Sequence, residues 1–248
     1  MSELPLKLDK GYLYMQVGAD WYLIDTGSFS SFSERGEVKI GERCFELPLK
    51  EIRGMNAAIL TEHVKVPVNG LLGNDVLDHF DHIWDLPNGI VTIGAPGSLA
   101  QGGSAVGLKR TAGLVAAALP GSEGVATPTM MQTDSGLVHV GAKVEEAHYA
   151  MIFDTGAAIS YFDFPDRERF PSAGEYTDFY PNVGPFTTDT RWVPATLGDT
   201  AFTLRCGTLK PVFGEMIRNT GIVGNEILKG RAVGYFPRRG QMVLGRAA

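Results

Sequence analysis

The chain has 248 residues, of which 44% are hydrophobic and 20% charged, a composition that excludes a disordered or collagen-like protein. Its 31 glycines and 14 prolines favour many short strands joined by tight turns, so we expect an all-β fold. The net charge of −6 has the wrong sign for holding a phosphate backbone, and no nucleic-acid partner is expected.

The start of the chain, residues 1–7, lacks the charged and apolar stretches of a secretion signal. No run approaches the roughly 18 apolar residues that span a bilayer, so we expect no membrane partner and a cytoplasmic location. In a reducing compartment, Cys44 and Cys206 are expected to be free and buried as small apolar residues.

The decisive feature is an internal duplication. Segment 21–28, Trp-Tyr-Leu-Ile-Asp-Thr-Gly-Ser, is echoed by segment 150–157, Ala-Met-Ile-Phe-Asp-Thr-Gly-Ala. Segment 71–77, Leu-Leu-Gly-Asn-Asp-Val-Leu, is echoed in the same order by segment 222–228, Ile-Val-Gly-Asn-Glu-Ile-Leu. A single Asp-Thr-Gly is a weak signal, but two copies with the same sequel indicate that the chain contains two related halves.

The duplication predicts three parts of the chain. These are an N-terminal lobe at 1–96 with the first Asp-Thr-Gly, a linker at 97–124 with a candidate interlobe strand, and a C-terminal lobe at 125–248 with the second Asp-Thr-Gly. The linker is indicated by its Gly, Ser and Pro content.

Alternating and apolar patterns predict strands at 12–17 and 137–140, each followed by a glycine turn and a further strand that ends at the aspartate. Only the short segments after Gly73 and Gly224 are predicted to be helical.

The repeated aspartates, Asp25 and Asp154, would be delivered by equivalent loops and can meet on a two-fold axis. Two like charges in a buried position cannot both ionise readily, so the pair would share one proton. One carboxylate can then act as a general base toward water while the protonated partner donates to a carbonyl oxygen.

The neighbouring residues suit this role. Gly27 and Gly156 allow tight turns that bring amide N–H groups toward the carboxylates. The hydroxyl groups of Thr26 and Thr155 are suited to hydrogen bonding across the axis, which would fix the two loops.

The residue after each Asp-Thr-Gly differs between the halves. Ser28 can donate a hydrogen bond to the carboxylate of Asp25, whereas Ala157 offers no donor from its side chain. We therefore expect Asp25 to hold more of the negative charge and Asp154 more of the shared proton.

With two Asp-Thr-Gly motifs and two downstream Gly-Asn motifs, the chain resembles the aspartic proteases, retropepsins and pepsins alike, over nearly its whole length. The resemblance implies a bilobal acid-protease fold, with two retropepsin-like β-barrel lobes related by pseudo-two-fold symmetry. It implies hydrolysis of a peptide or protein substrate by a water activated between Asp25 and Asp154, with no cofactor. Because one chain supplies both aspartates, we expect a monomer.

The second repeat departs from the first in its length. The interval from Asp154 to Gly224 is longer than that from Asp25 to Gly73, and the extra segment, 175–192, contains two strand-like stretches around a Pro-Asn-Val-Gly turn. This predicts a single flap, on the second lobe. Its candidate substrate-binding residues are Tyr176, Tyr180, Val183, Gly184 and Trp192.

Two alternatives accompany this interpretation. Segment 78–85 contains two histidines and three aspartates, but the second repeat has no metal-ligand types there, so a solvated short helix is favoured over a metal site. The expected function is an aspartic endopeptidase for limited intracellular proteolysis. The alternative is a peptide-binding or scaffolding module of the same fold with little turnover, although a binder has no need of two buried like charges.

Overall fold

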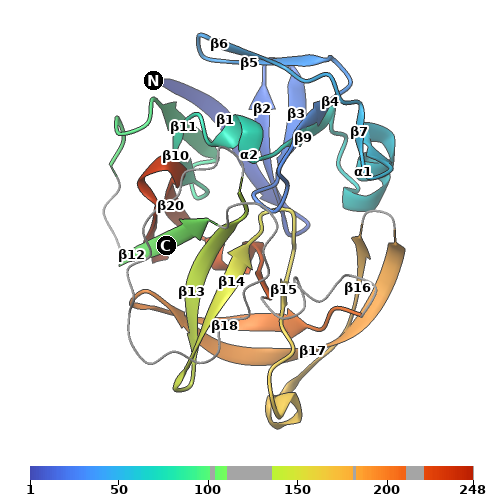
Figure 1. Ribbon diagram of the computed structural model, residues 1–248, viewed down its shortest axis with the longest axis vertical. Helices are drawn as coiled ribbons and strands as arrows, with labels where there is room; N and C mark the ends of the chain where they lie inside the picture. Colours follow the sequence, from blue (N-terminus) through green and yellow to red (C-terminus); the bar gives the residue numbers. More distant parts are fainter. Residues whose placement is uncertain (101–103, 111–135, 181–182, 211–220, 248) are drawn as a thin grey trace.

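The computed structural model describes residues 1–100, 104–110, 136–180, 183–210 and 221–247 (Figure 1). Most of these residues lie in β-strands, which confirms the predicted all-β class. None of the described helices is long and apolar enough to cross a bilayer.

The first part of the chain consists mainly of short strands. They are β1 (Ser2–Asp9), β2 (Tyr12–Val17), β3 (Asp20–Ile24), β4 (Phe32–Ser33), β5 (Glu37–Ile40), β6 (Arg43–Glu46), β7 (Glu51–Ile52), β8 (Met55–Asn56), β9 (Gly70–Leu72), β10 (Asp81–Asp85), β11 (Ile90–Gly94) and β12 (Ser104–Arg110). Two helices interrupt them, α1 (Ala57–Val64) and α2 (Asn74–Leu77).

The second part contains longer strands. They are β13 (Val138–Val144), β14 (Ala147–Phe153), β15 (Ser160–Tyr161), β16 (Ser172–Tyr180), β17 (Gly184–Leu197), β18 (Thr200–Gly207), β19 (Ile222–Val223), β20 (Arg231–Phe236) and β21 (Gln241–Ala247). Its described helical turns are of the 3₁₀ type: η1 (Arg167–Arg169), η3 (Asn225–Leu228) and η4 (Pro237–Arg239).

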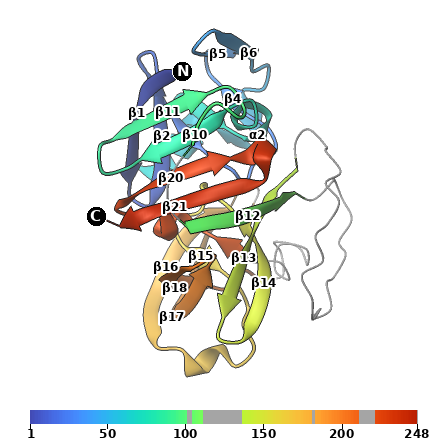
Figure 2. The ribbon, with the colours of Figure 1, turned by 90° about the vertical axis from the view of Figure 1, so that its left-hand side faces the viewer.

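One antiparallel sheet contains strands from both repeats. Its order is β1, β11, β10, β20, β21, β12, so that β10 of the first repeat pairs directly with β20 of the second. Figure 2 shows β20, β21 and β12 between β1, β10 and β11 above and β13–β18 below. Strand β12 also pairs with β13. It forms the start of the predicted interlobe strand. The rest of that stretch lies outside the described residues.

Both repeats contain the same arrangement of three paired strands. In the first, β3 runs parallel to β9, which also pairs antiparallel with β4. In the second, β14 runs parallel to β19, which pairs antiparallel with β15. The amide of Asp25 donates to Leu72 O at 2.9 Å, and that of Asp154 donates to Val223 O at 3.0 Å. Each aspartate therefore leaves its sheet at the equivalent point.

The main hydrophobic core joins the two repeats. Trp84 on β10 is fully buried and stacks on Tyr235 of β20, with ring centroids 5.0 Å apart. Phe153, at the end of β14, packs against both rings at centroid distances of 6.3 and 6.1 Å. The strand that carries the second aspartate is thus fixed on a core to which both halves contribute.

The helical predictions were correct in part. The segments after Gly73 and Gly224 are helical, as α2 and η3. Helix α1 was not predicted, although Asn56 caps it by accepting a hydrogen bond from Ile59 N at 3.0 Å. The capping residue and the run Ala-Ala-Ile-Leu that follows it indicate a helix. The expectation of an all-β fold led us to give these signals too little weight.

Two further predictions were wrong. Cys44 is exposed on the β5–β6 hairpin and not buried. The related predictions for the cysteines are confirmed, because Cys206 is buried and neither cysteine forms a disulfide. Segment 78–85 is not a solvated helix, because most of it forms β10. Asp81 there is fully buried, where Arg239 pairs with it at 2.9 Å.

Because Trp84 is buried between strands of both repeats, we expect Trp84→Ala to lower the free energy of unfolding by about 3–5 kcal/mol. The matched control is Ile90→Ala on the adjacent strand β11, where the side chain is 37% exposed and about 1 kcal/mol or less is expected. Urea unfolding measures both values, and equal losses would contradict a core shared by the two repeats.

Candidate active site

The two aspartates are held in equivalent settings and in contact with each other. Gly27 N donates to Asp25 Oδ1 at 2.9 Å, and Gly156 N donates to Asp154 Oδ1 at 2.8 Å. The two carboxyl groups share a hydrogen bond, and both side chains are half-buried. The structure therefore brings together the residues that the sequence placed 129 positions apart.

The two threonines fasten the aspartate loops to each other. Thr26 N donates to Thr155 Oγ1, and Thr155 N donates to Thr26 Oγ1, both at 3.0 Å. Each hydroxyl in turn donates across the pair, from Thr26 to Phe153 O and from Thr155 to Ile24 O, both at 2.7 Å. Both side chains are fully buried, and these four bonds confirm that the two threonines form hydrogen bonds between the aspartate loops.

The glycines are required by the close approach of the two loops. A Cβ atom on Gly156 would lie 2.7 Å from the carboxyl carbon of Asp25, and one on Gly27 would overlap the carboxyl group of Asp154. Any side chain at these positions would therefore displace the opposite carboxyl group.

The repeated asparagines have a role that sequence reasoning missed. Asn74 Nδ2 donates to Thr26 O at 2.9 Å, and Asn225 Nδ2 donates to Thr155 O at 2.6 Å. Both asparagines are fully buried, so each supports the loop of its own repeat from behind. The repetition of the Gly-Asn motif in both halves of the sequence was the signal that pointed to a shared role for these asparagines.

The pKa of each carboxyl group is raised above its ordinary value, and the Ser28 hydroxyl does not contribute the expected asymmetry. Burial, and next the charge of Asp154, raise the pKa of Asp25 well above its ordinary value. Burial also raises the pKa of Asp154, but its hydrogen bond with Asp25 opposes that rise. The Ser28 hydroxyl donates to Ser30 O at 2.8 Å and not to Asp25. The expected bias of the proton toward Asp154 therefore loses the hydrogen bond on which it was based.

The pair lies in a pocket of about 340 Å³ with apolar walls. The first repeat contributes Leu23, Phe32, Met55, Leu60, Val64 and Leu71, and the second contributes Leu137, Ile152, Ala157, Phe186, Leu209 and Ile222. These walls reduce the dielectric response around the carboxyl groups, which is the physical cause of their raised pKa values.

The predicted hairpin exists as β16–β17, with Tyr180 opposite Gly184, but it presents partly different residues to the pocket. Of the five predicted contact residues, only Tyr180 lines the pocket; Tyr176, Val183, Gly184 and Trp192 do not. Trp192 is 43% exposed and pairs with Arg205 on β18.

The hairpin residues that sequence reasoning missed are Asp178, Phe179 and Phe186, which all line the pocket. The first repeat also sends a hairpin there, β7–β8, whose Ile52, Arg53 and Met55 line the same pocket. The single-flap prediction is therefore incomplete. With only two residues in each strand, β7–β8 is too short to give a strand pattern in the sequence.

Within the part of the chain that the structure describes, no group of three or more His, Cys, Asp or Glu side chains is arranged to hold a metal ion. The chemistry open to the site is that of two carboxyl groups that share a proton.

No protein-family model matches the chain, and no curated protein matches its sequence. Among solved structures, it is similar to the crystal structure of basic 7S globulin from soybean, with 9% sequence identity and a TM-score of 0.48, over 98% of this chain and 94% of that chain. At that level of similarity, nothing about family or activity follows.

The raised pKa values make folding stability depend on pH. The folded chain binds protons at Asp25 and Asp154 more tightly than the unfolded chain, so their stabilisation is complete at low pH and declines as the pH rises through the raised values. We therefore expect Asp154→Asn to be more stable than the wild type at pH 7, by roughly 1 kcal/mol or more, and the difference to shrink toward pH 3.

Urea unfolding across this pH range measures the difference. Asp163→Asn, at an exposed position, serves as the matched control and should show no comparable trend. A stability difference for Asp154→Asn that did not change with pH would contradict the raised pKa values.

Proposed function

We propose that the protein is an aspartic endopeptidase with a bilobal acid-protease fold, whose two β-barrel lobes are related by pseudo-two-fold symmetry. The observation that carries the proposal is the half-buried pair of Asp25 and Asp154, each held by its own glycine N–H, with the two loops joined by the bonds between Thr26 and Thr155. A purely structural role gives no reason to bury two like charges side by side.

The mechanism follows from the shared proton. The ionised member of the pair removes a proton from a water molecule while the water oxygen forms a bond to the scissile carbonyl carbon. The protonated member donates its proton to the carbonyl oxygen, which gives a tetrahedral diol with no covalent bond to the protein. The carboxyl group that took the water proton then gives it to the amide nitrogen, and the other carboxylate takes back a proton from a diol hydroxyl as the C–N bond breaks, which releases the amine and restores the shared proton.

The pocket supports a peptide substrate. Apolar walls from both repeats flank the carboxyl pair, so an extended peptide can place side chains on either side of a bond that lies over it. Since both aspartates come from one chain, a monomer is sufficient. The proposed division at 1–96, 97–124 and 125–248 places one aspartate in each lobe.

The alternative of a peptide-binding module gains no support from the pocket. A hairpin on the second repeat alone would argue mildly for it, but β7–β8 also lines the pocket from the first repeat.

We expect Asp25→Asn and Asp154→Asn each to lower the rate of casein cleavage by on the order of 10³-fold or more, because each removes either the base or the acid. The rate is measured from the release of soluble peptides, and a chelator should leave it unchanged. Asp163→Asn, at an exposed position, should retain the wild-type rate. Unimpaired cleavage by either active-site variant would overturn the proposal.

The need for one shared proton also predicts a bell-shaped pH–rate profile. The rate should fall at low pH, where both carboxyl groups are protonated, and at high pH, where the shared proton is lost. Because the Ser28 hydroxyl donates to Ser30 O, Ser28→Ala should leave the acidic limb unmoved. A displaced acidic limb would show that this hydroxyl acts on Asp25 after all.

A further inference from the structure

A second buried carboxylate site lies on the wall of the same pocket. Asp178, on β16, is 7% exposed and accepts hydrogen bonds from Tyr12 at 3.2 Å, from its neighbour Phe179 N at 2.8 Å, and from Tyr161. His63 Nε2 lies 3.5 Å from its Oδ1. A buried carboxylate with this many partners is well satisfied, so Asp178 is not poised to bind substrate itself.

The partners of Asp178 come from both repeats. Tyr12 lies on β2 and His63 on α1 in the first repeat, whereas Tyr161 lies on β15 in the second. Tyr12 also contacts His63 Nε2 through its hydroxyl at 2.8 Å, which links the first-repeat partners to each other. The network therefore joins the long hairpin of one half to the helix of the other half.

Ring contacts strengthen the same junction. The ring of Phe179 lies 4.9 Å from that of His63, measured between centroids, and Tyr176 and Phe179 pack against the apolar cluster around α1. In Figure 1, the upper end of β16 approaches α1. The contact brings the end of the hairpin, with Phe179 and Tyr180, over the pocket that contains the aspartate pair.

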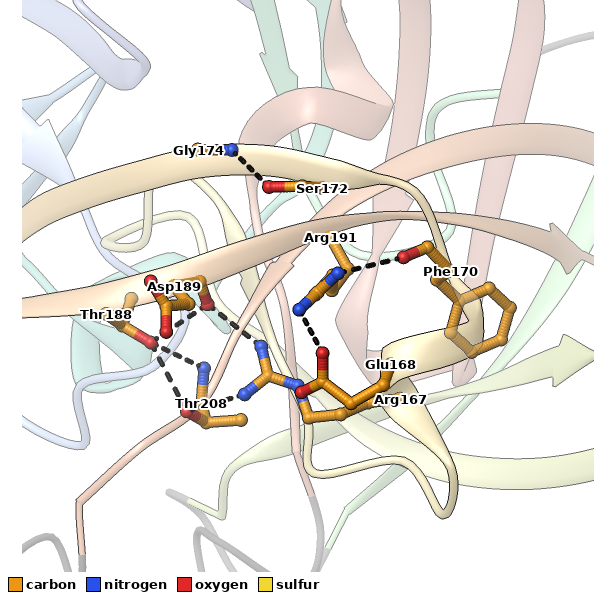
Figure 3. Close-up of polar contacts among 9 residues, drawn as sticks. All are labelled: Arg167, Glu168, Phe170, Ser172, Gly174, Thr188, Asp189, Arg191 and Thr208. Carbon is orange, nitrogen blue, oxygen red and sulfur yellow. Dashed lines mark hydrogen bonds and ion pairs between the residues drawn. The ribbon is translucent and has the colours of Figure 1, made fainter.

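The other end of the hairpin is fastened within its own repeat (Figure 3). Arg191 pairs with Glu168 of η1 and donates to Phe170 O at 3.3 Å. Arg167 donates to Asp189 O at 2.9 Å and to Thr208 Oγ1 at 3.3 Å. The base of the hairpin is thus held independently of the pocket, and its pocket end is held to the first repeat by the Asp178 network.

We infer that Asp178 is a positioning residue: with Tyr12, His63 and Tyr161 it latches the β16–β17 hairpin onto α1 and so holds Phe179 and Tyr180 over the aspartate pair. This inference rests on the proposed function for the identity of the occupant, an extended apolar peptide. The latch itself is a contact between two halves of the chain and is measurable without any substrate.

The test measures the distance between the hairpin and α1. In a Cys44→Ser background, Thr187→Cys and Glu62→Cys place spin labels at exposed positions on β17 and α1. In the labelled protein that keeps Asp178, we expect one narrow distance distribution. In the labelled Asp178→Asn variant, a population with longer distances should appear. The ratio of open to closed hairpin should then rise about tenfold, as expected for a lost hydrogen bond to a buried charge.

Two further variants complete this measurement. Glu175→Gln removes a negative charge from an exposed position on the same strand and should leave the distances unchanged. Tyr12→Phe removes the hydroxyl that bridges His63 and Asp178, so it tests the latch even if Asp178→Asn does not fold. Unchanged distances in Tyr12→Phe and in any folded Asp178→Asn would overturn the latch.

A second measurement tests whether the latch acts on the site. The probe is an apolar peptide with a hydroxyl-bearing tetrahedral carbon in place of the scissile carbonyl. Its dissociation rate should increase about tenfold in Asp178→Asn and stay at the wild-type value in Glu175→Gln. An unchanged dissociation rate beside a changed distance would overturn the positioning role. A peptide that fails to bind the wild type would instead count against the proposed function, while the distances still decide whether the latch exists.

Discussion

The structure depends on two half-buried carboxyl groups in contact with each other. Burial and mutual repulsion disfavour two charges there, and both effects raise the pKa of Asp25. Such a pair persists only if the surrounding backbone cannot move apart, and the crossed bonds between Thr26 and Thr155 provide that restraint. The shared sheet and the core around Trp84 and Tyr235 hold the two loops in register from below.

Much of this arrangement was predictable because its key motifs occur twice in the sequence. The duplicated Asp-Thr-Gly and Gly-Asn motifs predicted the strands that end at each aspartate and the short helices after Gly73 and Gly224. They also predicted the hydrogen bonds between Thr26 and Thr155, since two similar loops in contact offer similar hydrogen-bonding groups to each other. Repetition acted as an internal control that a single motif does not provide.

The features that escaped prediction depend on tertiary packing. Helix α1 has an asparagine cap but lies outside the repeated motifs, so the duplication gave no support for it. The Ser28 hydroxyl had two acceptors within reach, and only the fold shows that it bonds to Ser30. Asp178 could not be distinguished from other acidic residues in a strand, because its partners, Tyr12 and Tyr161, come from distant parts of the chain.

The central pairing of β10 with β20 has a consequence for biosynthesis. It joins His82 to Tyr235, so the ends of a very long loop must meet before it forms, whereas the hairpins β2–β3 and β13–β14 are local and can form early. The carboxyl pair is completed only when the second repeat docks. A nascent polypeptide on the ribosome therefore carries its first aspartate for a long time before that residue has a partner, and the carboxyl pair forms only when both repeats have folded.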